Sequence, residues 1–413
     1  MRTDVIVLGA GAVGVSAAVH LRQKGREVVL LDRRGAGEET SFGNAGIIER
    51  DPFVPVAFPR ALGDLVRYGL NLSPAAHYHL THMPKIASWL WALRRNTDTA
   101  GIERYAGHIA ALTERANAEH EAMIVAAKAE RFLKTDGWFR FYRTEKGFRE
   151  ADQLHDLARR HGSSFRVISA AEFREIEPNV LEVPHKAVHW TGSWTISSPG
   201  GLVAAYADLF QSLGGRFLTG DARSLRKTAT GWSVTTSEGD IEAADVVVAL
   251  GPWSADLLRP FGLNVPLASK RGYHLHFGPK DGATLNHTVV DVENGYLIAP
   301  MDAGIRLTTG IEFADRDAAP TPVQIDRLKP VARKLFPLAE ERDEAPWMGS
   351  RPALPDSLPI VGPAPGLKGL WLNLGHGHLG LTLGPVTGRL IAELITGQPP
   401  TVDVAPYRAE RFL

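Results

Sequence analysis

A glycine-rich stretch near the start of the chain, Gly9-Ala10-Gly11-Ala12-Val13-Gly14, has the spacing of a loop that holds the diphosphate of a dinucleotide. In such a loop, Gly9 permits a tight turn, Gly11 lets the backbone approach the diphosphate, and Gly14 lets a helix pack closely on a strand. Asp32 ends the next apolar run, where a carboxylate can accept hydrogen bonds from ribose hydroxyls. These residues predict a dinucleotide-binding unit, and the alternative is an ordinary glycine-rich turn.

The elements that must position this loop can be recognised on either side of it. Residues 4–8 form an apolar run typical of a buried strand, residues 12–25 are small and apolar as in a helix, and residues 27–32 contain a second apolar run. The apolar N-terminus has the outline of a signal peptide, but little charge precedes it and its glycines stand where a nucleotide loop needs them. We therefore interpret it as the first strand and helix of the fold, with an anion at the helix N-terminus.

The segment that follows Asp32 is rich in glycine and in small hydroxyl or amide side chains. Such residues let backbone and side-chain donors come close to a ligand. Because the segment directly follows the nucleotide-type unit, we expect it to contact the ligand instead of forming a plain surface loop. The expected contacts come from Arg33, Ser41, Asn44 and Gly46.

The C-terminal part of the chain carries a second glycine-rich stretch, Gly375-His376-Gly377-His378-Leu379-Gly380-Leu381-Thr382, between an expected strand at 370–374 and an expected helix at about 385–395. Together with GAGAVG, LLDRR and ETSFGNAGII near the N-terminus, this stretch resembles the bacterial FAD-dependent D-amino acid dehydrogenases of the small-subunit type. That family lies in a larger group with D-amino acid oxidase, glycine oxidase and sarcosine oxidase. The resemblance covers most of the chain and is weakest between residues 51 and 190.

The resemblance implies FAD as the cofactor and assigns residues to it. The C-terminal stretch would lie against the pyrimidine end of the flavin, with Thr382 donating to a flavin carbonyl and the carbonyl of His378 accepting from a substrate amine. The expected cofactor-binding residues are Gly9, Gly11, Ala12, Val13, Gly14, Asp32, Arg33, Ser41, Asn44, Gly46, Gly251, Trp253, Gly375, Gly377, His378, Leu379, Gly380 and Thr382.

Arg351 is the expected substrate-binding residue. A guanidinium holds a carboxylate through two parallel hydrogen bonds, and the Gly-Ser-Arg-Pro setting of Arg351 matches the family's carboxylate-binding arginine. Tyr296, in NGYLIAP, matches the tyrosine that assists this carboxylate, and Tyr273 is a further candidate whose alternative is a half-buried strand tyrosine. His376 and His378 are candidate proton acceptors, because imidazole titrates in the useful range.

The function that the resemblance implies is FAD-dependent oxidative deamination of a D-amino acid, a step of amino acid catabolism. A hydride would pass from the α-carbon to flavin N5, and the imino acid would hydrolyse to a keto acid and ammonia. The electrons would pass to a quinone, another carrier or oxygen, but not to NAD. The sequence leaves open an oxidase or dehydrogenase of a secondary amine of the sarcosine, glycine, proline or hydroxyproline type.

Two further readings belong to other classes of protein. The N-terminal loop alone permits an NAD-dependent dehydrogenase, and a flavin-binding module that docks to RNA is a second alternative. The 46 basic and 46 acidic residues leave no net charge, which argues against nucleic acid as a partner. The absence of cysteine excludes disulfides and thiolate sites, and the histidines lack the spacing of metal ligands, so no metal site is expected.

Residues 52–95 combine five prolines with aromatic and basic side chains. We interpret them as an irregular insertion that folds over the catalytic face. The alternative is a peripheral contact with the inner membrane, because aromatic and basic residues together suit a lipid interface, and similar dehydrogenases pass electrons to the respiratory chain. No run in the 413 residues is long and apolar enough to span a bilayer, and we expect a cytoplasmic protein.

The predicted fold class is α/β (α+β), a Rossmann-like FAD-binding domain of the D-amino acid oxidase type interleaved with a β-rich substrate domain. We assign residues 1–50, 195–268 and 348–413 to the FAD-binding domain and residues 51–194 and 269–347 to the substrate-binding domain. The oligomeric state is not predicted.

Apolar periodicity predicts the other main elements. Helices are expected at 101–131, 147–161 and 199–213, and a strand is expected at 138–142. The Asn294-Gly295 pair predicts the turn that begins a hairpin strand.

Overall fold

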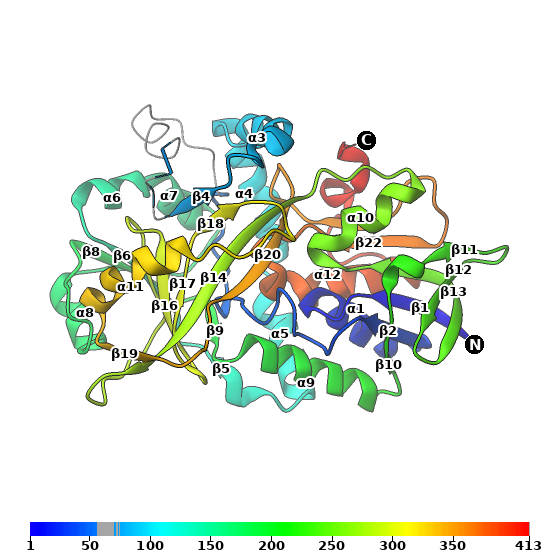
Figure 1. Ribbon diagram of the computed structural model, residues 1–413, viewed down its shortest axis with the longest axis horizontal. Helices are drawn as coiled ribbons and strands as arrows, with labels where there is room; N and C mark the ends of the chain where they lie inside the picture. The colour runs from blue at the N-terminus through cyan, green and yellow to red at the C-terminus, as the bar shows by residue number, and fades with distance from the viewer. Residues whose placement is uncertain (56–69, 72, 74, 413) are drawn as a thin grey trace.

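The structure is a computed structural model that describes residues 1–55, 70–71, 73 and 75–412. The molecule is elongated, with one large sheet toward each end, and the chain begins and ends in the same lobe (Figure 1). This arrangement agrees with the predicted fold class, in which two sheet-based parts interleave along the sequence.

The first sheet is built on parallel strands. β1 (Arg2–Leu8) lies between β2 (Val28–Asp32) and β13 (Gly239–Val248) and runs parallel to both. β10 (Arg216–Thr219) pairs in parallel with β2, and β22 (Leu370–Leu374) pairs in parallel with the last part of β13. The carboxyl ends of these strands therefore meet at one edge of the sheet, the place where open α/β sheets bind their ligands.

Three antiparallel strands complete this sheet. β12 (Trp232–Thr236) pairs with the first half of β13, β11 (Arg226–Lys227) pairs with β12, and β21 (Ile360–Pro363) pairs with β22. The sequence predicts a short strand at Ile241 and a separate one from Asp245, but the structure has one continuous strand, β13, through both.

Helix α1 (Ala12–Gln23) follows β1 directly, which confirms that the apolar N-terminus is a strand and helix of the fold. It packs against α12 (Gly380–Ile395) because two glycines of α12 let the backbones approach closely. A Cβ at Gly384 would lie 2.9 Å from the carbonyl oxygen of Ala12, and one at Gly388 would lie 2.7 Å from the amide nitrogen of Ala17.

The C-terminal helix begins earlier than its sequence indicates. The sequence predicts a start near Pro385, but α12 begins at Gly380 and contains Pro385 in its interior. A proline there has no N–H to donate to the carbonyl of Leu381. His120 Nε2 lies 2.9 Å from that carbonyl oxygen, and burial lowers the pKa of His120 to about 4. A neutral imidazole therefore donates the hydrogen bond that the proline cannot.

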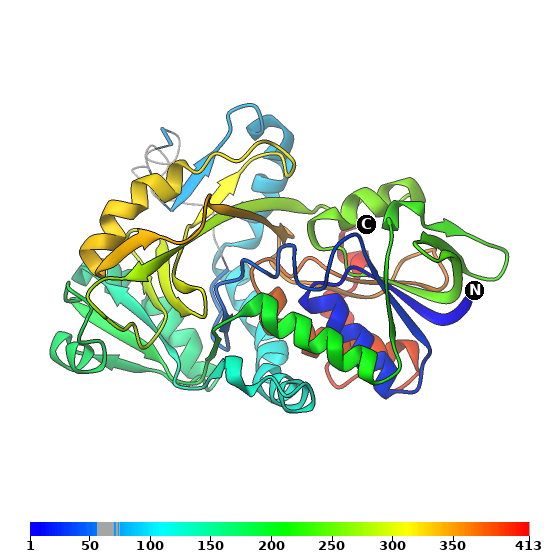
Figure 2. The same cartoon turned by 60° about the horizontal axis from the view of Figure 1, so that its bottom comes forward.

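The second sheet is centred on β14 (Ala268–Pro279), a long strand that reaches from one lobe toward the other (Figure 2). Antiparallel to it run β17 (Gly304–Thr308), β18 (Ile311–Phe313), β19 (Leu338–Glu341) and β20 (Trp347–Ala353). The remaining strands of this sheet are β4 (Ala76–Tyr78), β6 (Trp138–Tyr142), β7 (Arg166–Ile168), β8 (Lys186–Trp190), β15 (Val289–Asp291) and β16 (Tyr296–Met301). The expected strand at 138–142 is thus confirmed as β6.

The two faces of β14 have different surroundings because side chains alternate along a strand. Tyr273, Leu275 and Phe277 enter an apolar core that packs under α11 (Val323–Leu335). Lys270 and Gly272 instead line a cavity between the lobes.

Short elements connect these layers. A third sheet joins β3 (Ile47–Ile48), β9 (Trp194–Ile196) and β5 (Leu133–Lys134). The remaining helices are α3 (Met83–Asn96), α4 (Thr99–Thr113), α5 (Ala116–Ala126), α6 (Glu145–Glu150), α7 (Asp152–Arg160), α8 (Ala170–Ile176), α9 (Pro199–Ser212) and α10 (Ser254–Leu258). The expected helices at 101–131, 147–161 and 199–213 are therefore present as α4 with α5, α6 with α7, and α9.

Helices α4 and α5 pack against α12. The sequence assigns both to the substrate-binding domain, whereas α12 lies in a segment assigned to the FAD-binding domain. Buried side chains on one face of α4, at Ile102, Ala106 and Ile109, explain this packing. Among the residues described, no helix has the length and apolarity needed to cross a bilayer.

Candidate active site

One large cavity, of about 1130 Å³, lies between the two lobes. The carboxyl ends of the parallel strands lie at its wall. At each of four of these ends, an expected cofactor-binding residue lines the cavity. These residues are Gly9 after β1, Asp32 at the end of β2, Gly251 after β13 and Gly375 after β22. The expected cofactor site is therefore assembled from four segments that are far apart in the sequence.

At the nucleotide end, the first glycine loop is too tightly packed for side chains. Gly9 has a φ of +104°, and a Cβ there would lie 2.4 Å from the carbonyl oxygen of Ala249. A Cβ at Gly14 would lie 1.8 Å from the carbonyl oxygen of Gly9. Gly14 does not line the cavity, so its role is to bring α1 against β1, whereas Gly11, Ala12 and Val13 line the cavity.

Asp32 faces the same end of the cavity. Its carboxylate accepts hydrogen bonds from the backbone N–H of Ala10 at 2.7 Å and of Arg34 at 3.1 Å. Burial raises the pKa of Asp32, and these backbone hydrogen bonds act in the opposite direction. Beside it, the guanidinium of Arg33 lies 4.3 Å from the ring centroid of Trp253, and both residues line the cavity.

The loop after β2 connects the two lobes across the cavity. Ser41 Oγ accepts a hydrogen bond from the backbone N–H of Ala12, and the Thr40 hydroxyl donates to the carbonyl of Ser350. Asn44 Nδ2 donates to the carbonyl of His378 at 3.3 Å. Arg33, Ser41 and Asn44 line the cavity, whereas Gly46 lies outside its lining and has a φ of +75°.

The groups that line this cavity fit FAD. Two helices, α1 and α12, begin at its wall. Ser41 accepts from the first N–H of α1, but neither helix is capped by the side chain of its own N-cap residue, and neither has an acidic residue in its first turn. An uncapped helix N-terminus stabilises a negative charge. The first helix could hold the diphosphate beside Gly11, and the second could act on the flavin ring beside the C-terminal loop.

The C-terminal loop lines the cavity through Gly375, His376, Gly377, His378, Leu379 and Gly380. Gly375 and Gly377 have φ values of +81° and +58°, which favour glycine. Thr382 does not line the cavity, because its hydroxyl donates to the carbonyl of Ile47 and accepts from the N–H of Glu49. The loop therefore borders the cavity, but the Thr382 hydroxyl lies outside the cavity lining and bonds to Ile47 of β3 and to Glu49.

The two loop histidines have different surroundings, and the pKa of each is lowered. His376 Nε2 lies 3.0 Å from the Thr387 hydroxyl, and burial lowers the pKa of His376 to about 3. The His378 ring is about half exposed in the cavity lining, and its setting there together with the positive charges of Arg351, Lys270 and Arg140 lowers its pKa. The low pKa of the buried His376 makes that ring a poor proton acceptor near neutral pH.

Arg351 lies on the cavity face of β20. Its guanidinium donates to the carbonyl oxygens of Gly310 at 2.9 Å and Thr309 at 3.4 Å, which fixes its position and leaves other N–H groups toward the cavity. Gly272 makes room for it, since a Cβ there would lie 2.5 Å from Nη2. Burial lowers the pKa of Arg351 to about 10, so it stays charged at neutral pH.

Glu49, which the sequence analysis did not select, is the acid at this end of the cavity. Its carboxylate lies 3.8 Å from His378 Nε2 and 4.0 Å from Arg140 Nη2. Burial raises the pKa of Glu49 to about 7, against the opposing charge of Arg140. Its only signal in the sequence is its position three residues after Gly46, and the tertiary structure places it just after β3 at the cavity lining.

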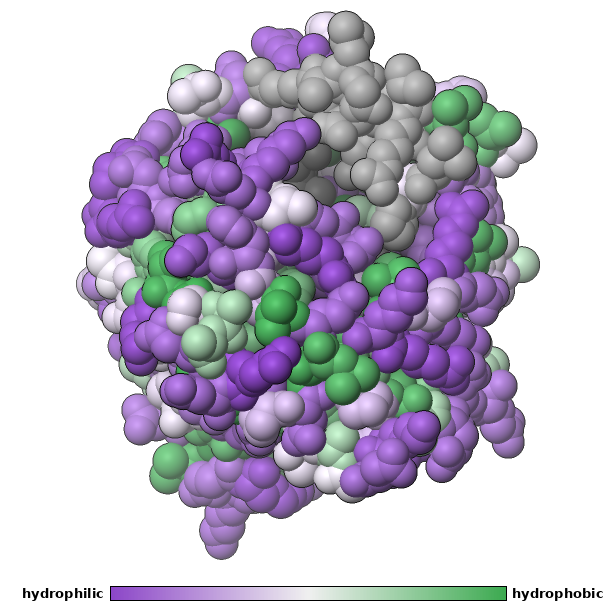
Figure 3. All heavy atoms as spheres, turned by 90° about the vertical axis from the view of Figure 1, so that its left-hand side faces the viewer, coloured by the Kyte–Doolittle hydropathy of each residue, from purple (hydrophilic) through white to green (hydrophobic). Residues whose placement is uncertain are grey.

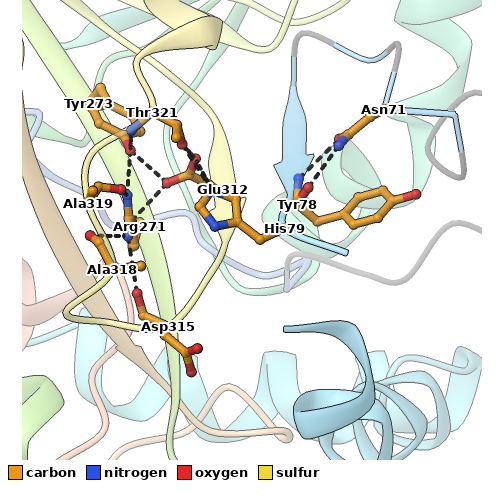
Figure 4. Close-up of polar contacts among 10 residues, drawn as sticks. All are labelled: Asn71, Tyr78, His79, Arg271, Tyr273, Glu312, Asp315, Ala318, Ala319 and Thr321. Carbon is orange, nitrogen blue, oxygen red and sulfur yellow. Dashed lines mark hydrogen bonds and ion pairs between the residues drawn. The ribbon is translucent and has the colours of Figure 1, made fainter. Parts of the chain in front are cut away.

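Tyr273 has its hydroxyl in a buried network and not in the cavity (Figure 4). The hydroxyl accepts from Arg271 at 2.7 Å and donates to Glu312 at 2.7 Å, and it also accepts from the N–H of Thr321. Arg271 Nε lies 2.8 Å from Glu312. The residue borders the cavity, but its hydroxyl is fully used elsewhere.

Tyr296 lies on the far face of its strand. It belongs to the apolar core with Ile298 and Leu307, whereas its neighbour Leu297 lines the cavity. The family pattern aligns Tyr296 with a substrate-binding tyrosine, but the strand's alternation turns its hydroxyl away from Arg351. We therefore leave Tyr296 out of the proposed site.

The described residues contain one group with the spacing of metal ligands, His77, His79 and Glu312, whose ligand atoms lie within 4.8 Å of one another. The sequence predicts no metal site, because Glu312 lies far along the chain from His77 on β4 and from His79 just after it. Arg271 already neutralises Glu312 at 2.8 Å and would repel a cation. We assign Glu312 to the network of Figure 4 and not to a metal.

Comparisons with known proteins agree with this geometry. Residues 4–394 match the family model described as DAO, FAD dependent oxidoreductase. The chain is 32% identical to a D-amino acid dehydrogenase of Paramagnetospirillum magneticum, across 99% of this chain and 98% of that protein. It is 28% identical to a D-amino-acid oxidase of Bradyrhizobium diazoefficiens, across 99% of both. The crystal structure of a glycine oxidase from Geobacillus kaustophilus superposes with a TM-score of 0.73 at 23% identity, covering 100% of this chain and 99% of that one.

Proposed function

Because this chain belongs to the DAO family of FAD-dependent oxidoreductases and acts on amino acids, we propose that its substrate is a D-amino acid, which it deaminates oxidatively. The observation that carries this proposal is Arg351, a charged guanidinium at the cavity wall. No carboxylate among the described residues forms an ion pair with it. FAD is the cofactor of this family, so the alternative of an NAD-dependent dehydrogenase is excluded.

The reaction removes two electrons and two protons from the substrate. The bond between the α-carbon and its hydrogen breaks, and the nitrogen lone pair forms the C=N bond of an imino acid. When bound, FAD accepts the hydrogen with its electron pair. Water then adds to the imino acid, and ammonia leaves to give the keto acid.

The chain's own residues bind and orient the substrate. Arg351 holds the α-carboxylate through parallel hydrogen bonds, which fixes both the position and the orientation of the α-carbon. The carbonyl of His378 already accepts from Asn44 and keeps a second lone pair for the substrate amine. Glu49 is the group whose pKa suits it to take the proton that the ammonium must lose.

We expect the rate constant for flavin reduction at low substrate to rise with pH and to level off above about 7, the pKa of Glu49. Below that pH the carboxyl is protonated and cannot accept a proton from the substrate. Glu49→Gln should abolish this limb of the pH profile and slow reduction by roughly 100-fold. Stopped-flow absorbance under argon measures both effects. Glu341→Gln, at an exposed site, is the control, and a Glu49→Gln enzyme that keeps the limb would contradict the role.

The D-amino acid proposal is tested by anaerobic titration of the purified yellow protein with matched D- and L-amino acids, sarcosine and D-proline. Bleaching by D-amino acids with silent L-enantiomers supports the proposal. Bleaching by sarcosine or proline-type amines alone would move the enzyme to the secondary-amine alternative. That alternative draws support from the glycine oxidase fold neighbour, which shares the fold at 23% identity.

The proposed electron acceptor is a quinone, another carrier or oxygen. Part of the segment 52–95, which could contact a membrane surface, lies outside the described residues. Within the described part, Leu70, Leu80 and Trp91 are exposed apolar side chains, which supports such a contact. The face shown in Figure 3 is mainly hydrophilic, with small apolar groups scattered over it.

A further inference from the structure

Three positive side chains surround one end of the cavity. Lys270 on β14 stands directly opposite Arg351 on the neighbouring antiparallel strand β20, and both line the cavity. Arg140 on β6 lines it from another side. The charges of all three act on the His378 ring, which is about half exposed and forms part of the cavity lining. The cations therefore converge on one region.

The acidic side chains do not balance this charge. Glu49 is the acid near Arg140, at 4.0 Å. Among the described residues, neither Lys270 nor Arg351 has a carboxylate within ion-pair distance, and Arg351 is the main charge acting on Lys270. Lys270 is only 6% exposed, so water does not compensate for the missing anion.

The aromatic neighbour of Lys270 is a weak substitute for an anion. The ammonium lies 5.0 Å from the ring centroid of Trp89, a residue of α3 that packs with Ala268 and Ala353. A cation–π contact of this kind stabilises a buried ammonium less than a carboxylate does. Two neighbouring cations with no acid between them carry an uncompensated charge, which two negative groups of a ligand would neutralise.

We propose that Arg351 and Lys270 form a two-anion site, in which Arg351 holds the α-carboxylate and Lys270 holds a second carboxylate at the end of the substrate side chain. This inference rests on the proposed function and narrows it, since the preferred substrates are acidic D-amino acids such as D-aspartate or D-glutamate. Lys270 is a specificity-determining residue. The enzyme should prefer D-aspartate to D-asparagine and D-glutamate to D-glutamine because of charge, since each acid and its amide have almost the same shape.

The first test compares anaerobic flavin reduction of the holoenzyme by D-aspartate with D-asparagine, and by D-glutamate with D-glutamine. We expect the second-order rate constant for the better acid to exceed that of its amide by about tenfold or more. Lys270→Met should reduce this ratio by about the same factor, and Lys270→Arg should keep the preference for the acid. Lys227→Met, at an exposed site on β11, is the matched control and should leave the ratio as it is.

The second test needs no turnover. The oxidised holoenzyme is titrated with succinate and glutarate, and with butyrate and valerate of the same length, while the visible flavin spectrum is recorded. We expect the dicarboxylates to bind about tenfold more tightly than the monocarboxylates. Lys270→Met should remove this difference, and Lys227→Met should retain it. FAD content and thermal midpoint confirm that each variant is folded.

The two tests separate the two hypotheses. If D-amino acids leave the flavin oxidised but dicarboxylates bind in a Lys270-dependent way, the two-anion site stands and the D-amino acid proposal fails. If D-amino acids bleach the flavin but amides match acids, and monocarboxylates match dicarboxylates, the function stands and the two-anion site is wrong. A Lys270→Met enzyme that slows acids and amides equally also overturns it, because Lys270 would then act on a step common to all substrates.

Discussion

Replacing Arg351 with leucine should lower the second-order rate constant for flavin reduction by roughly 100-fold to 1000-fold, about 3–4 kcal/mol of transition-state stabilisation. The substrate carboxylate would then enter a cavity wall without its charge partner, and the α-carbon would lose its fixed orientation. Anaerobic stopped-flow bleaching of the flavin, over a range of D-amino acid concentrations, separates the loss of affinity from the loss of rate.

Two variants identify the cause of such a loss. Arg351→Lys keeps the charge but not the paired geometry, so its rate should lie between those of the wild type and Arg351→Leu. Arg342→Leu removes a different arginine that also donates to a backbone carbonyl, that of Ala303, outside the cavity lining. It should reduce the flavin at the normal rate. An Arg351→Leu enzyme with normal turnover and normal substrate affinity would remove Arg351 from the site.

Replacing Gly14 with alanine should cost about 3 kcal/mol or more and should release the flavin. The added Cβ would lie 1.8 Å from the carbonyl oxygen of Gly9, an overlap that only a movement of α1 or β1 can relieve. Either movement displaces the helix N-terminus that borders the nucleotide end of the cavity. The ratio of visible to ultraviolet absorbance of the purified protein measures the flavin content, and thermal unfolding measures the stability.

Gly107→Ala is the matched control for that substitution. Gly107 is an exposed residue within α4, and a Cβ there meets no atom within 4 Å. Alanine should stabilise the helix by about 0.5–1 kcal/mol and leave the flavin content unchanged. A Gly14→Ala protein that keeps full flavin content and the wild-type unfolding temperature would show that α1 can move without disturbing the cavity.

Local sequence determined the nucleotide end of this protein. β1, its glycine loop, α1 and β2 follow one another within the first 32 residues, so spacing alone indicates how they pack. The strand at Trp138–Tyr142 and the helix at Pro199–Ser212 were predictable for the same reason, because hydrophobic periodicity along one segment reports that segment's own structure. The family, the fold class and the FAD cofactor were also predictable, since the motifs at both ends of the chain resemble one family.

Only the tertiary structure decided which side chains face the cavity. A strand presents alternate residues to opposite faces, and the pairing of β16 with β15 and β17 turned Leu297 toward the cavity and Tyr296 into the core. The start of α12 likewise depended on His120, which lies far from Leu381 in the sequence and supplies the hydrogen bond that Pro385 cannot.

Arg351 was predictable from its motif, but the other charges at its end of the cavity were not, because they come from separate segments. Glu49, Arg140, Lys270 and Arg351 lie on different elements, and no short motif contains two of them. They meet because β14 pairs with β20 in a register that sets Lys270 opposite Arg351. The burial that raises the pKa of Glu49, and the positive charges that lower the pKa of His378, exist only after these segments have packed together.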